Sequence, residues 1–318
     1  MELPEPLRQA IERHAQDADQ TLLTRDAQAL SARYRTQTGG GKSLITNDTE
    51  PLAYALARMP ATYGATHAAL SHALAATEEK PETLLDAGAG TGAVSWAADQ
   101  LLDLKEITCL ERAQGMAALG MELMREGSPA LQNARWMRHD LTAEVIPQRG
   151  DLVVASYVLG EMTEQKRIEV AEKLWNAAEK MLLIVEPGTP VGYANLMMIR
   201  RALLDLGAHI AAPCPCEGDC PLPPDDWCGF TCRVQRTRIH RRLKGGDAPF
   251  EDEKFSYVAF TREAVDSARQ RVLRHPQIYS GYVELRLCTA DGIEDRTVTK
   301  KDGELYRHAR KADAGDAL

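Results

Sequence analysis

Residues 83–92 read Thr83-Leu84-Leu85-Asp86-Ala87-Gly88-Ala89-Gly90-Thr91-Gly92, an apolar run that leads into three alternating glycines. The apolar run predicts a strand, and the segment from Ala93 onward predicts a helix. Glycine suits such a junction because the backbone turns tightly there and a ligand can approach without obstruction by a Cβ atom. The stretch therefore predicts a cofactor-binding loop at the end of a buried strand.

The same alternation of strand and helix continues after the glycines. Further apolar runs typical of strands are ITCLE (107–111), ARWMRHD (134–140), DLVVAS (151–156) and MLLIVEP (181–187), followed by FSYVAFT (255–261) and YVELRLCT (282–289). Amphipathic segments separate the first five runs, which is the β-α-β rhythm of a doubly wound parallel sheet. The sequence thus predicts an α/β fold.

Three carboxylates follow successive strands and predict an adenosine-type cofactor. Asp86 directly precedes the glycines, where its carboxylate can reach a ligand's ammonium group directly or through water. Glu111 ends the second strand, where a carboxylate can accept both ribose hydroxyls. Asp140 follows the third strand, the usual position for recognition of the adenine amino group.

Two cofactors are compatible with this pattern. The spacing Gly88-x-Gly90-x-x-Ala93 satisfies a loose dinucleotide fingerprint, and Glu111 fits NAD as well as S-adenosylmethionine. The third glycine, Gly92, gives Asp-x-Gly-x-Gly-x-Gly, which together with Asp86 favours S-adenosylmethionine. We therefore expect a class I, Rossmann-like methyltransferase sheet.

The loops that should supply catalytic groups are less informative. They read SYVLGEM (156–162) after the fourth strand and EPGTP (186–190) after the fifth. The Asn/Asp-Pro-Pro-aromatic tetrapeptide of many amino-group methyltransferases is absent, and neither loop holds a nucleophilic cysteine. Tyr157 or Glu161 could orient a substrate, but they also fit a packed tyrosine and a helix-start glutamate. No catalytic residue is predicted.

A proline-rich segment carries five of the seven cysteines. Cys214, Cys216, Cys220, Cys228 and Cys232 fall within 19 residues, and only Cys109 and Cys288 lie elsewhere, on predicted strands. In a reducing compartment such a cluster indicates metal binding rather than disulfides. The spacing differs from that of zinc ribbons, and it leaves both zinc and an iron–sulfur cluster open.

A basic stretch follows the cysteines and predicts contact with RNA phosphates. Residues 233–244 hold six cations without an acid; these are Arg233, Arg236, Arg238, Arg241, Arg242 and Lys244. A solvated helix face is the simpler interpretation, and the acids of Glu251-Asp252-Glu253 could pair with the arginines. Lys300, Lys301, Arg307, Arg310 and Lys311 in the tail could extend the surface.

The net charge of −8 does not exclude such a partner, because the acids are unevenly distributed. Residues 1–207 hold 28 acids and 20 bases, whereas residues 208–318 hold 18 of each. The excess acidity therefore belongs to the part of the chain that precedes the cysteines.

The composition shifts divide the chain into an N-terminal helical region (1–76), a methyltransferase-like domain (77–290) with a cysteine-rich and basic insertion (208–250), and a polar tail (291–318) expected to end as a helix and a loose segment. Residues 36–51 predict a connecting loop; its Gly41-Lys42-Ser43 lacks the rest of a phosphate-loop motif. No apolar run is long enough for a membrane helix and no signal peptide is apparent. We expect a soluble, cytoplasmic protein.

Several motifs together resemble one known family, the methyltransferase-like assembly proteins of the small ribosomal subunit, found in mitochondria and bacteria. The matching stretches are PATYG (60–64), LLDAGAGTG, SYVLGEM, CPCEGDCPL, DWCGF, RTRIHRRLKGG, EDEKFSYV, RVLRHP and YRHARK. The resemblance covers most of the chain from about residue 30, and its most specific part runs from the cysteines to EDEKFSYV.

The resemblance implies a class I methyltransferase fold with a [4Fe–4S] cluster, bound to small-subunit ribosomal RNA during assembly. The implied ligands are Cys214, Cys220, Cys228 and Cys288. The sequence departs from the family pattern at Cys216 and Gly229, where histidine is common. Cys216 and Cys232 are then spare thiols beside the site.

Three hypotheses follow. The first is an S-adenosylmethionine-binding, iron–sulfur protein that acts on small-subunit ribosomal RNA as a methyltransferase. The second is a non-catalytic assembly factor that uses the fold and the metal site to dock on RNA. The third is an NAD-linked oxidoreductase.

Overall fold

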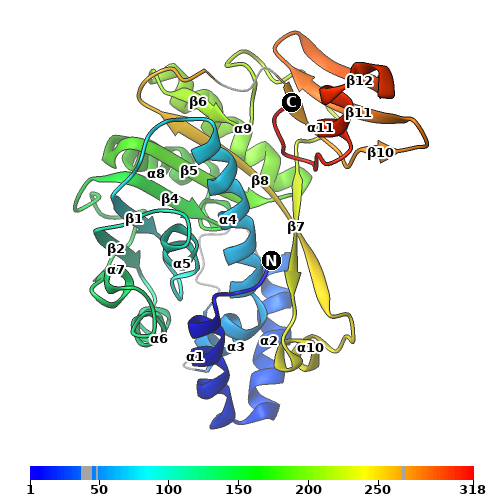
Figure 1. Ribbon diagram of the computed structural model, residues 1–318. Helices are drawn as coiled ribbons and strands as arrows, with labels where there is room; N and C mark the ends of the chain where they lie inside the picture. Colours follow the sequence, from blue (N-terminus) through cyan, green and yellow to red (C-terminus); the bar gives the residue numbers. More distant parts are fainter. Residues whose placement is uncertain (37–44, 48, 267–269) are drawn as a thin grey trace.

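The glycine stretch connects β1 (Thr83–Ala87) to α5 (Ala93–Asp99) in the middle of an eight-stranded sheet (Figure 1). This computed structural model describes residues 1–36, 45–47, 49–266 and 270–318. The other strands of the sheet are β2 (Glu106–Glu111), β3 (Arg135–Arg138), β4 (Gly150–Ser156), β5 (Ala178–Pro187), β6 (His209–Ala212), β7 (Phe230–Gln235) and β8 (Phe250–Thr261).

The strand order is β3-β2-β1-β4-β5-β8-β6, with β7 paired to β8. Strands β1 to β5 are mutually parallel, and β8 runs antiparallel to β5, β6 and β7. The chain reverses its direction of strand addition between β1 and β4, which is the switch point where ligands bind in such sheets. The α/β class I methyltransferase fold predicted from the sequence is confirmed.

Helices cover both faces of this sheet. The helices that precede the first strand or connect later strands are α1 (Glu5–Gln16), α2 (Gln20–Thr36), α3 (Glu50–Ala57), α4 (Met59–Ala75), α5, α6 (Gln114–Met124), α7 (Pro129–Gln132), α8 (Glu164–Ala177), α9 (Pro190–Asp205) and α10 (Arg238–Lys244). Leu84, Val154 and Leu183 pack on the face of α4 and α5, whereas the adjacent Leu85 and Val153 pack on the face of α8 and α9. This alternation follows from the two-residue period of a strand that is buried on both sides.

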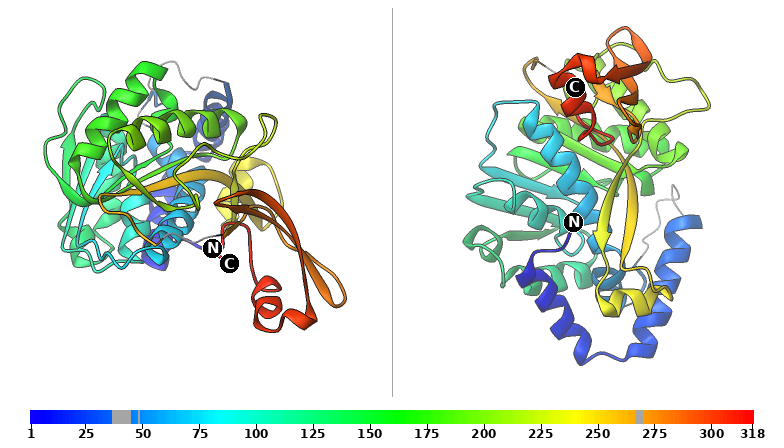
Figure 2. Two further views of the ribbon diagram at one scale, coloured as in Figure 1. Left: turned by 90° about the horizontal axis from the view of Figure 1, so that it is seen from above. Right: turned by 45° about the vertical axis from the view of Figure 1, so that its right-hand side comes forward.

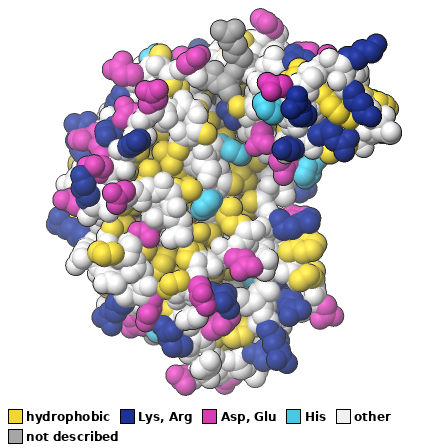
Figure 3. All heavy atoms as spheres, in the orientation of Figure 1, with side chains coloured by type: hydrophobic (Ala, Val, Ile, Leu, Met, Phe, Trp, Pro, Cys, Tyr) yellow, Lys and Arg dark blue, Asp and Glu magenta, His cyan; other side chains and the backbone are white. Residues whose placement is uncertain are grey.

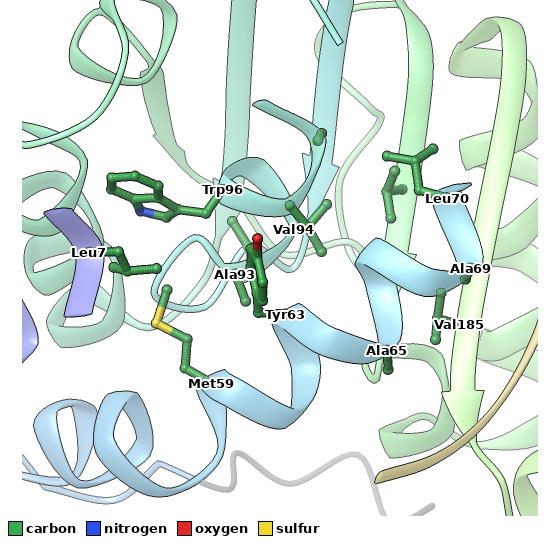
Figure 4. Close-up of a cluster of buried hydrophobic side chains, with 14 of the residues drawn as sticks. Leu7, Met59, Tyr63, Ala65, Ala69, Leu70, Ala93, Val94, Trp96 and Val185 are labelled. Carbon is green, nitrogen blue, oxygen red and sulfur yellow. The ribbon is translucent and has the colours of Figure 1, made fainter. Parts of the chain in front are cut away.

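The N-terminal helices share a core with the sheet. Leu7 of α1 and Tyr63 of α4 lie in one apolar cluster with Trp96 of α5 and Val185 of β5 (Figure 4). The backbone of α4 approaches β7 so closely that a Cβ atom on Gly64 would lie 2.8 Å from the Val234 side chain. The division of the chain at residue 76 remains a prediction.

A second, four-stranded sheet forms the C-terminal lobe, which projects beside β7 (Figures 1 and 2). It contains β9 (Gln270–Val272), β10 (Gln277–Ile278), β11 (Tyr282–Thr289) and β12 (Gly292–Thr299), followed by the short turn η2 (Lys300–Asp302) and α11 (Glu304–Ala309). The predicted terminal helix is confirmed.

The end of the chain, expected to be loose, is held against β9. Val272 donates its N–H to Asp316 O at 2.9 Å, and Arg271 forms a β-bridge with Ala317. Unpaired strand edges attract such backbone pairing, which polarity alone does not reveal.

Of the predicted loop at 36–51, residues 37–44 and 48 lie outside the described part of the chain, so the tripeptide at Gly41 is not described. Within the described ranges, none of the helices is long and apolar enough to cross a bilayer.

Candidate functional site: a cofactor cavity and a cysteine cavity

A cavity of about 240 Å³ opens at the carboxyl ends of β1, β2 and β4. It lies at the switch point of the sheet, where class I folds bind their ligands. Of the residues predicted to bind the cofactor, Gly88, Gly90, Glu111 and Asp140 line this cavity. The structure therefore brings together most of the predicted set.

The glycine loop adopts a backbone that only glycine enters easily. Gly88, Gly90 and Gly92 have φ angles of 77°, 57° and 88°. A Cβ atom on Gly88 would lie 2.7 Å from the Val158 side chain, and one on Gly92 would lie 2.4 Å from that of Met124. At Gly90 the nearest atom is 3.4 Å away, because this position borders the cavity.

Glu111 and Asp140 stand on the same wall with different surroundings. The Glu111 carboxylate accepts the N–H groups of Gly90 at 2.8 Å and Ala113 at 2.7 Å, and burial raises its pKa despite these bonds. Asp140 accepts the Thr142 hydroxyl at 2.7 Å and the Thr142 N–H at 2.9 Å. The hydrogen bond from the hydroxyl is the main reason that the pKa of Asp140 is lowered. Glu111 thereby ties the glycine loop to the end of β2.

Asp86 does not line the cavity. Its side chain is buried beneath the loop and accepts the Ser95 hydroxyl at 2.8 Å and the Ser95 N–H at 3.2 Å. Its other carboxylate oxygen has no hydrogen-bond partner among the described residues, and burial raises the Asp86 pKa to about 7. Asp86 is thus positioned to hold α5 to β1 rather than to meet a ligand's ammonium group directly.

Several lining residues come from segments to which the sequence assigned no role. Tyr54 of α3, Arg58 between α3 and α4, and Thr62 of α4 reach the cavity. They stand in or just before PATYG, a stretch that contributed to the family resemblance, so a signal was present without an assignable function.

The loop after β4 also borders the cavity. Glu161 lines it, and burial, reinforced by Glu111, raises the Glu161 pKa to about 8. Tyr157 has a φ of 58°, unusual for a bulky residue, and its hydroxyl donates to Glu253 of β8 at 2.9 Å. The two residues considered as substrate-orienting groups are therefore both at the cavity, and one of them is anchored to β8.

The four cysteines implied as metal ligands line a second cavity. Cys214, Cys220, Cys228 and Cys288 surround a small space of about 30 Å³ whose other walls are mostly apolar. Cys288 comes from β11 of the second sheet, whereas the other three cysteines lie in the irregular segment between β6 and β7. Burial, reinforced by the neighbouring thiols, raises the pKa of Cys228 and, to about 12, that of Cys288.

This donor set fits a thiophilic metal centre, since three thiols of one segment and a fourth from β11 line one mostly apolar cavity. As the side chains stand, no three His, Cys, Asp or Glu groups among the described residues are close enough together to coordinate an ion. Hydrogen bonds from neighbouring side chains reach two of these cysteines: Ser256 donates to Cys228 O at 2.6 Å, and Tyr193 donates to Cys220 Sγ at 3.0 Å.

The remaining thiols lie outside this lining. Cys232 is buried next to Gly64 on α4, and Cys109 is buried 3.4 Å from the Ser95 hydroxyl. Cys216 is half-buried, and its carbonyl accepts Arg200 at 2.9 Å.

The predicted basic stretch divides into paired and exposed cations. Arg236 and Lys244 both donate to Glu251, at 2.7 and 2.6 Å, and the exposed Arg233 pairs with Asp252 at 2.7 Å. The expected internal pairing therefore occurs.

The other three cations of the stretch lie on α10. Arg238 and Arg242 are exposed, Arg241 is half-buried, and Arg242 donates to Gln20. No ion pair involves any of the three within the described ranges, so they are the members best placed to meet a partner.

Comparison with known proteins places this geometry in context. The profile of a family described as mitochondrial small ribosomal subunit Rsm22 matches residues 48–318. The human mitochondrial ribosome assembly protein METTL17 is 31% identical, with 75% of this chain and 56% of that protein covered. The Rsm22-cox11 tandem proteins 1 and 2 of Schizosaccharomyces pombe, also mitochondrial, are each 23% identical, and the match covers 96% of this chain and 47% of each of those proteins.

The chain spans about half the length of these curated relatives. Among solved structures, magnesium protoporphyrin IX methyltransferase from Synechocystis PCC 6803, with bound S-adenosylmethionine, is 16% identical, with a TM-score of 0.44 over 77% of this chain and 98% of that one.

The expected cytoplasmic localisation is contradicted by these matches, because the family and the three relatives are described as mitochondrial. The expectation rested on the lack of a membrane helix and a signal peptide. Neither observation distinguishes the cytoplasm from another reducing compartment.

Proposed function

The chain belongs to the Rsm22 family of mitochondrial small ribosomal subunit proteins, and from this premise we propose that it assists assembly of the small ribosomal subunit, binds S-adenosylmethionine and a [4Fe–4S] cluster, and methylates small-subunit ribosomal RNA. The observation that carries the proposal is the presence of two separate lined cavities in one chain. One lies at the switch point of a methyltransferase sheet, and the other is lined by four cysteines.

The first cavity suits S-adenosylmethionine along its whole length. Glu111 is available for the ribose hydroxyls and Asp140 for the adenine amino group, while Gly88 and Gly90 leave room for close approach. Arg58 brings a positive charge to the remaining wall, which suits the carboxylate of the methionine part. The bound cofactor would supply a methyl group on a cationic sulfur.

The second cavity suits an iron–sulfur cluster held by Cys214, Cys220, Cys228 and Cys288. Cysteine thiolates are the usual ligands of [4Fe–4S] clusters, and the apolar surroundings exclude water from the sulfurs. Zinc is the alternative occupant for the same four thiolates.

RNA contact is supported by the exposed cations of α10. Arg238 and Arg242, with the half-buried Arg241, are the members of the basic stretch on α10 that do not pair with the half-buried Glu251. The exposed Arg233 can join them, whereas Arg236 and Lys244 are paired with Glu251 of β8. Cations of this kind contact phosphates without reading base sequence.

The loop after β4 favours a second candidate, a non-catalytic assembly factor that docks through the same surfaces. The Tyr157 hydroxyl is engaged by Glu253, and Glu161, with a pKa of about 8, is largely protonated at neutral pH. A protonated carboxyl is a poor general base for a methyl acceptor.

Transfer of label from S-adenosylmethionine to small-subunit precursors separates the two candidates. We expect the wild-type chain to label the RNA and Glu111→Gln to lose at least about tenfold in cofactor affinity, because glutamine replaces one acceptor oxygen with an N–H donor facing a backbone N–H. Glu122→Gln, an exposed change on α6, is the matched control. Cofactor binding without labelling would favour the docking factor, and binding of NAD alone would favour an oxidoreductase.

Anaerobic purification tests the metal assignment independently of activity. We expect a brown protein that contains iron and acid-labile sulfide. A colourless, zinc-loaded protein under the same conditions would refute the cluster.

A further inference from the structure

The C-terminal lobe ends in a hairpin whose tip carries two stacked tyrosines. Tyr279 and Tyr282 flank the two-residue turn, with the Tyr279 N–H donating to Tyr282 O at 3.0 Å. Their rings lie 4.7 Å apart and nearly parallel, at 13°. Tyr279 is 41% exposed and its neighbour Ile278 is 49% exposed. The tip thus presents a rigid aromatic surface to the surroundings.

Two lysines stand beside this aromatic pair. Tyr282 is the register partner of Thr299 at the end of β12, and Lys300 donates its N–H to Gly281 O at 3.1 Å. The turn η2 therefore begins next to the tyrosines, and both Lys300 and Lys301 are exposed.

The charges of the lobe are sorted between its body and its tip. Near the body, Arg274 and Arg286 pair with Asp226, and Arg296 pairs with Glu294. At the tip, neither lysine pairs with a carboxylate anywhere in the described ranges.

The acid next to these lysines in the sequence, Asp302, already has partners. The Asp302 carboxylate accepts the N–H and the hydroxyl of Thr299, at 2.6 and 2.9 Å. Figure 3 shows Lys and Arg side chains gathered over this lobe, next to hydrophobic ones.

We propose that this tip, formed by Tyr279, Tyr282, Lys300 and Lys301, binds unpaired segments of RNA, with a base stacked on Tyr279 and phosphates at the lysines. Every base has a face that stacks on an aromatic ring, and that face is accessible only where the RNA is not in a duplex. Lysine is depleted at the centre of protein–protein interfaces, so a protein partner fits the tip less well.

The tip is separate from the basic residues of α10. The C-terminal lobe and α10 lie at opposite ends of the hairpin of β7 and β8, as both Figures 1 and 2 show. The inference rests on the proposed function, since it specifies which form of RNA the protein meets and where.

The test is fluorescence anisotropy with the full chain and a labelled, unstructured RNA strand of about ten nucleotides, alone and annealed to its complement. We expect Tyr279→Ala to weaken single-strand binding at least about fivefold, because stacking of one base is lost. Tyr279→Phe should stay within about twofold, because it keeps the ring. The double change Lys300→Ala with Lys301→Ala should reduce the salt dependence by about 1.4 in log–log slope, about 0.7 for each phosphate contact. Unchanged thermal unfolding identifies the folded variants.

Two results would overturn the proposal that the tip binds unpaired RNA. One is equal single-strand binding by Tyr279→Ala and the wild type while the wild type still sediments with small-subunit precursors, which leaves the proposed function intact. The other is loss of precursor binding by Tyr279→Ala without loss of single-strand binding, which would assign the tip to a ribosomal protein. Failure of the wild type to bind either RNA or precursors would refute the proposed function together with the tip.

Discussion

The two cavities differ in how the chain builds them. The cofactor cavity is assembled largely from strand ends that succeed one another along the chain, whereas the cysteine cavity joins an irregular proline-rich segment to β11 of a different sheet. The first inherits its rigidity from the sheet and its backbone ladder. The second has apolar walls but little regular backbone pairing of its own, so we expect it to depend on crosslinking by a metal.

The largest expected effect tests whether the cysteine cavity depends on a metal. Cys288→Ser should remove most of the bound iron, at least tenfold by metal analysis, because one of four thiolates is lost. The thermal unfolding temperature should fall with it, since β11 would no longer be tied to the segment around Cys214.

Cys216→Ser is the matched control, because that thiol does not line the cavity. Equal loss of iron in Cys216→Ser would contradict the ligand assignment, because a thiol outside the cavity would then be as necessary as Cys288.

The second prediction probes the rigidity of the cofactor loop. Gly88→Ala places a Cβ 2.7 Å from Val158 at a φ of 77°, so strain and steric overlap together should lower the free energy of unfolding by about 3 kcal/mol. Urea unfolding measures the change, and cofactor affinity should fall as well.

Gly207→Ala separates strain from overlap. Gly207 has a φ of 82° with no atom within 4 Å of a built Cβ, so only the conformational cost of about 1–2 kcal/mol should appear. If the two variants unfold alike, Val158 makes room and the loop is softer than the structure indicates.

The third prediction uses pH to distinguish Asp86 from Asp140. Burial raises the folded-state pKa of Asp86 from 3.8 to about 7, so the folded chain holds a proton that the unfolded chain has released. This contribution to stability is present below pH 4 and is lost as the pH rises to about 7, at up to about 1.4 kcal/mol per pH unit.

Asp86→Asn removes this dependence. Relative to the wild type, its free energy of unfolding should therefore increase by roughly 2 kcal/mol between pH 5.5 and 7. Urea midpoints across this range measure the difference.

Asp140 should show the opposite pH dependence. Its pKa is lowered in the folded chain, so its contribution to the free energy of unfolding is present above the unfolded-state pKa and disappears as the pH falls, and Asp140→Asn should remove this dependence. A constant difference between Asp86→Asn and the wild type across the range would show that Asp86 is ionised in the folded protein.

The ease of predicting each cavity follows from the same difference in construction. The glycine loop, Glu111 and Asp140 stand at strand ends, and parallel strands bring their carboxyl ends to one edge, so order along the chain translates into proximity. The convergence of Cys288 with the other three thiols depends on how the second sheet packs, which no local pattern encodes. Family resemblance alone identified it.

Asp86 shows where local reasoning was available but incomplete. In a strand, alternate residues share a face, so Asp86 lies on the face of Leu84, toward α5 and Ser95. Similarly, β7 has the alternating pattern of a strand, with Phe230, Cys232 and Val234 on its buried face. This strand was not predicted from the sequence, because the neighbouring cations drew attention to charge.

The smallest expected effect tests whether the two cavities are independent. A hydrogen bond joins each cavity to β8: Tyr157 to Glu253 on the cofactor side, and Ser256 to the Cys228 carbonyl on the other. Tyr157→Phe and Ser256→Ala each remove one bond and should lower the free energy of unfolding by about 1 kcal/mol. If the cavities are independent, Tyr157→Phe weakens cofactor binding and leaves iron content unchanged, while Ser256→Ala does the reverse. If each variant alters both quantities, β8 transmits changes between the cavities, and the contrast between a rigid site and a metal-dependent one fails.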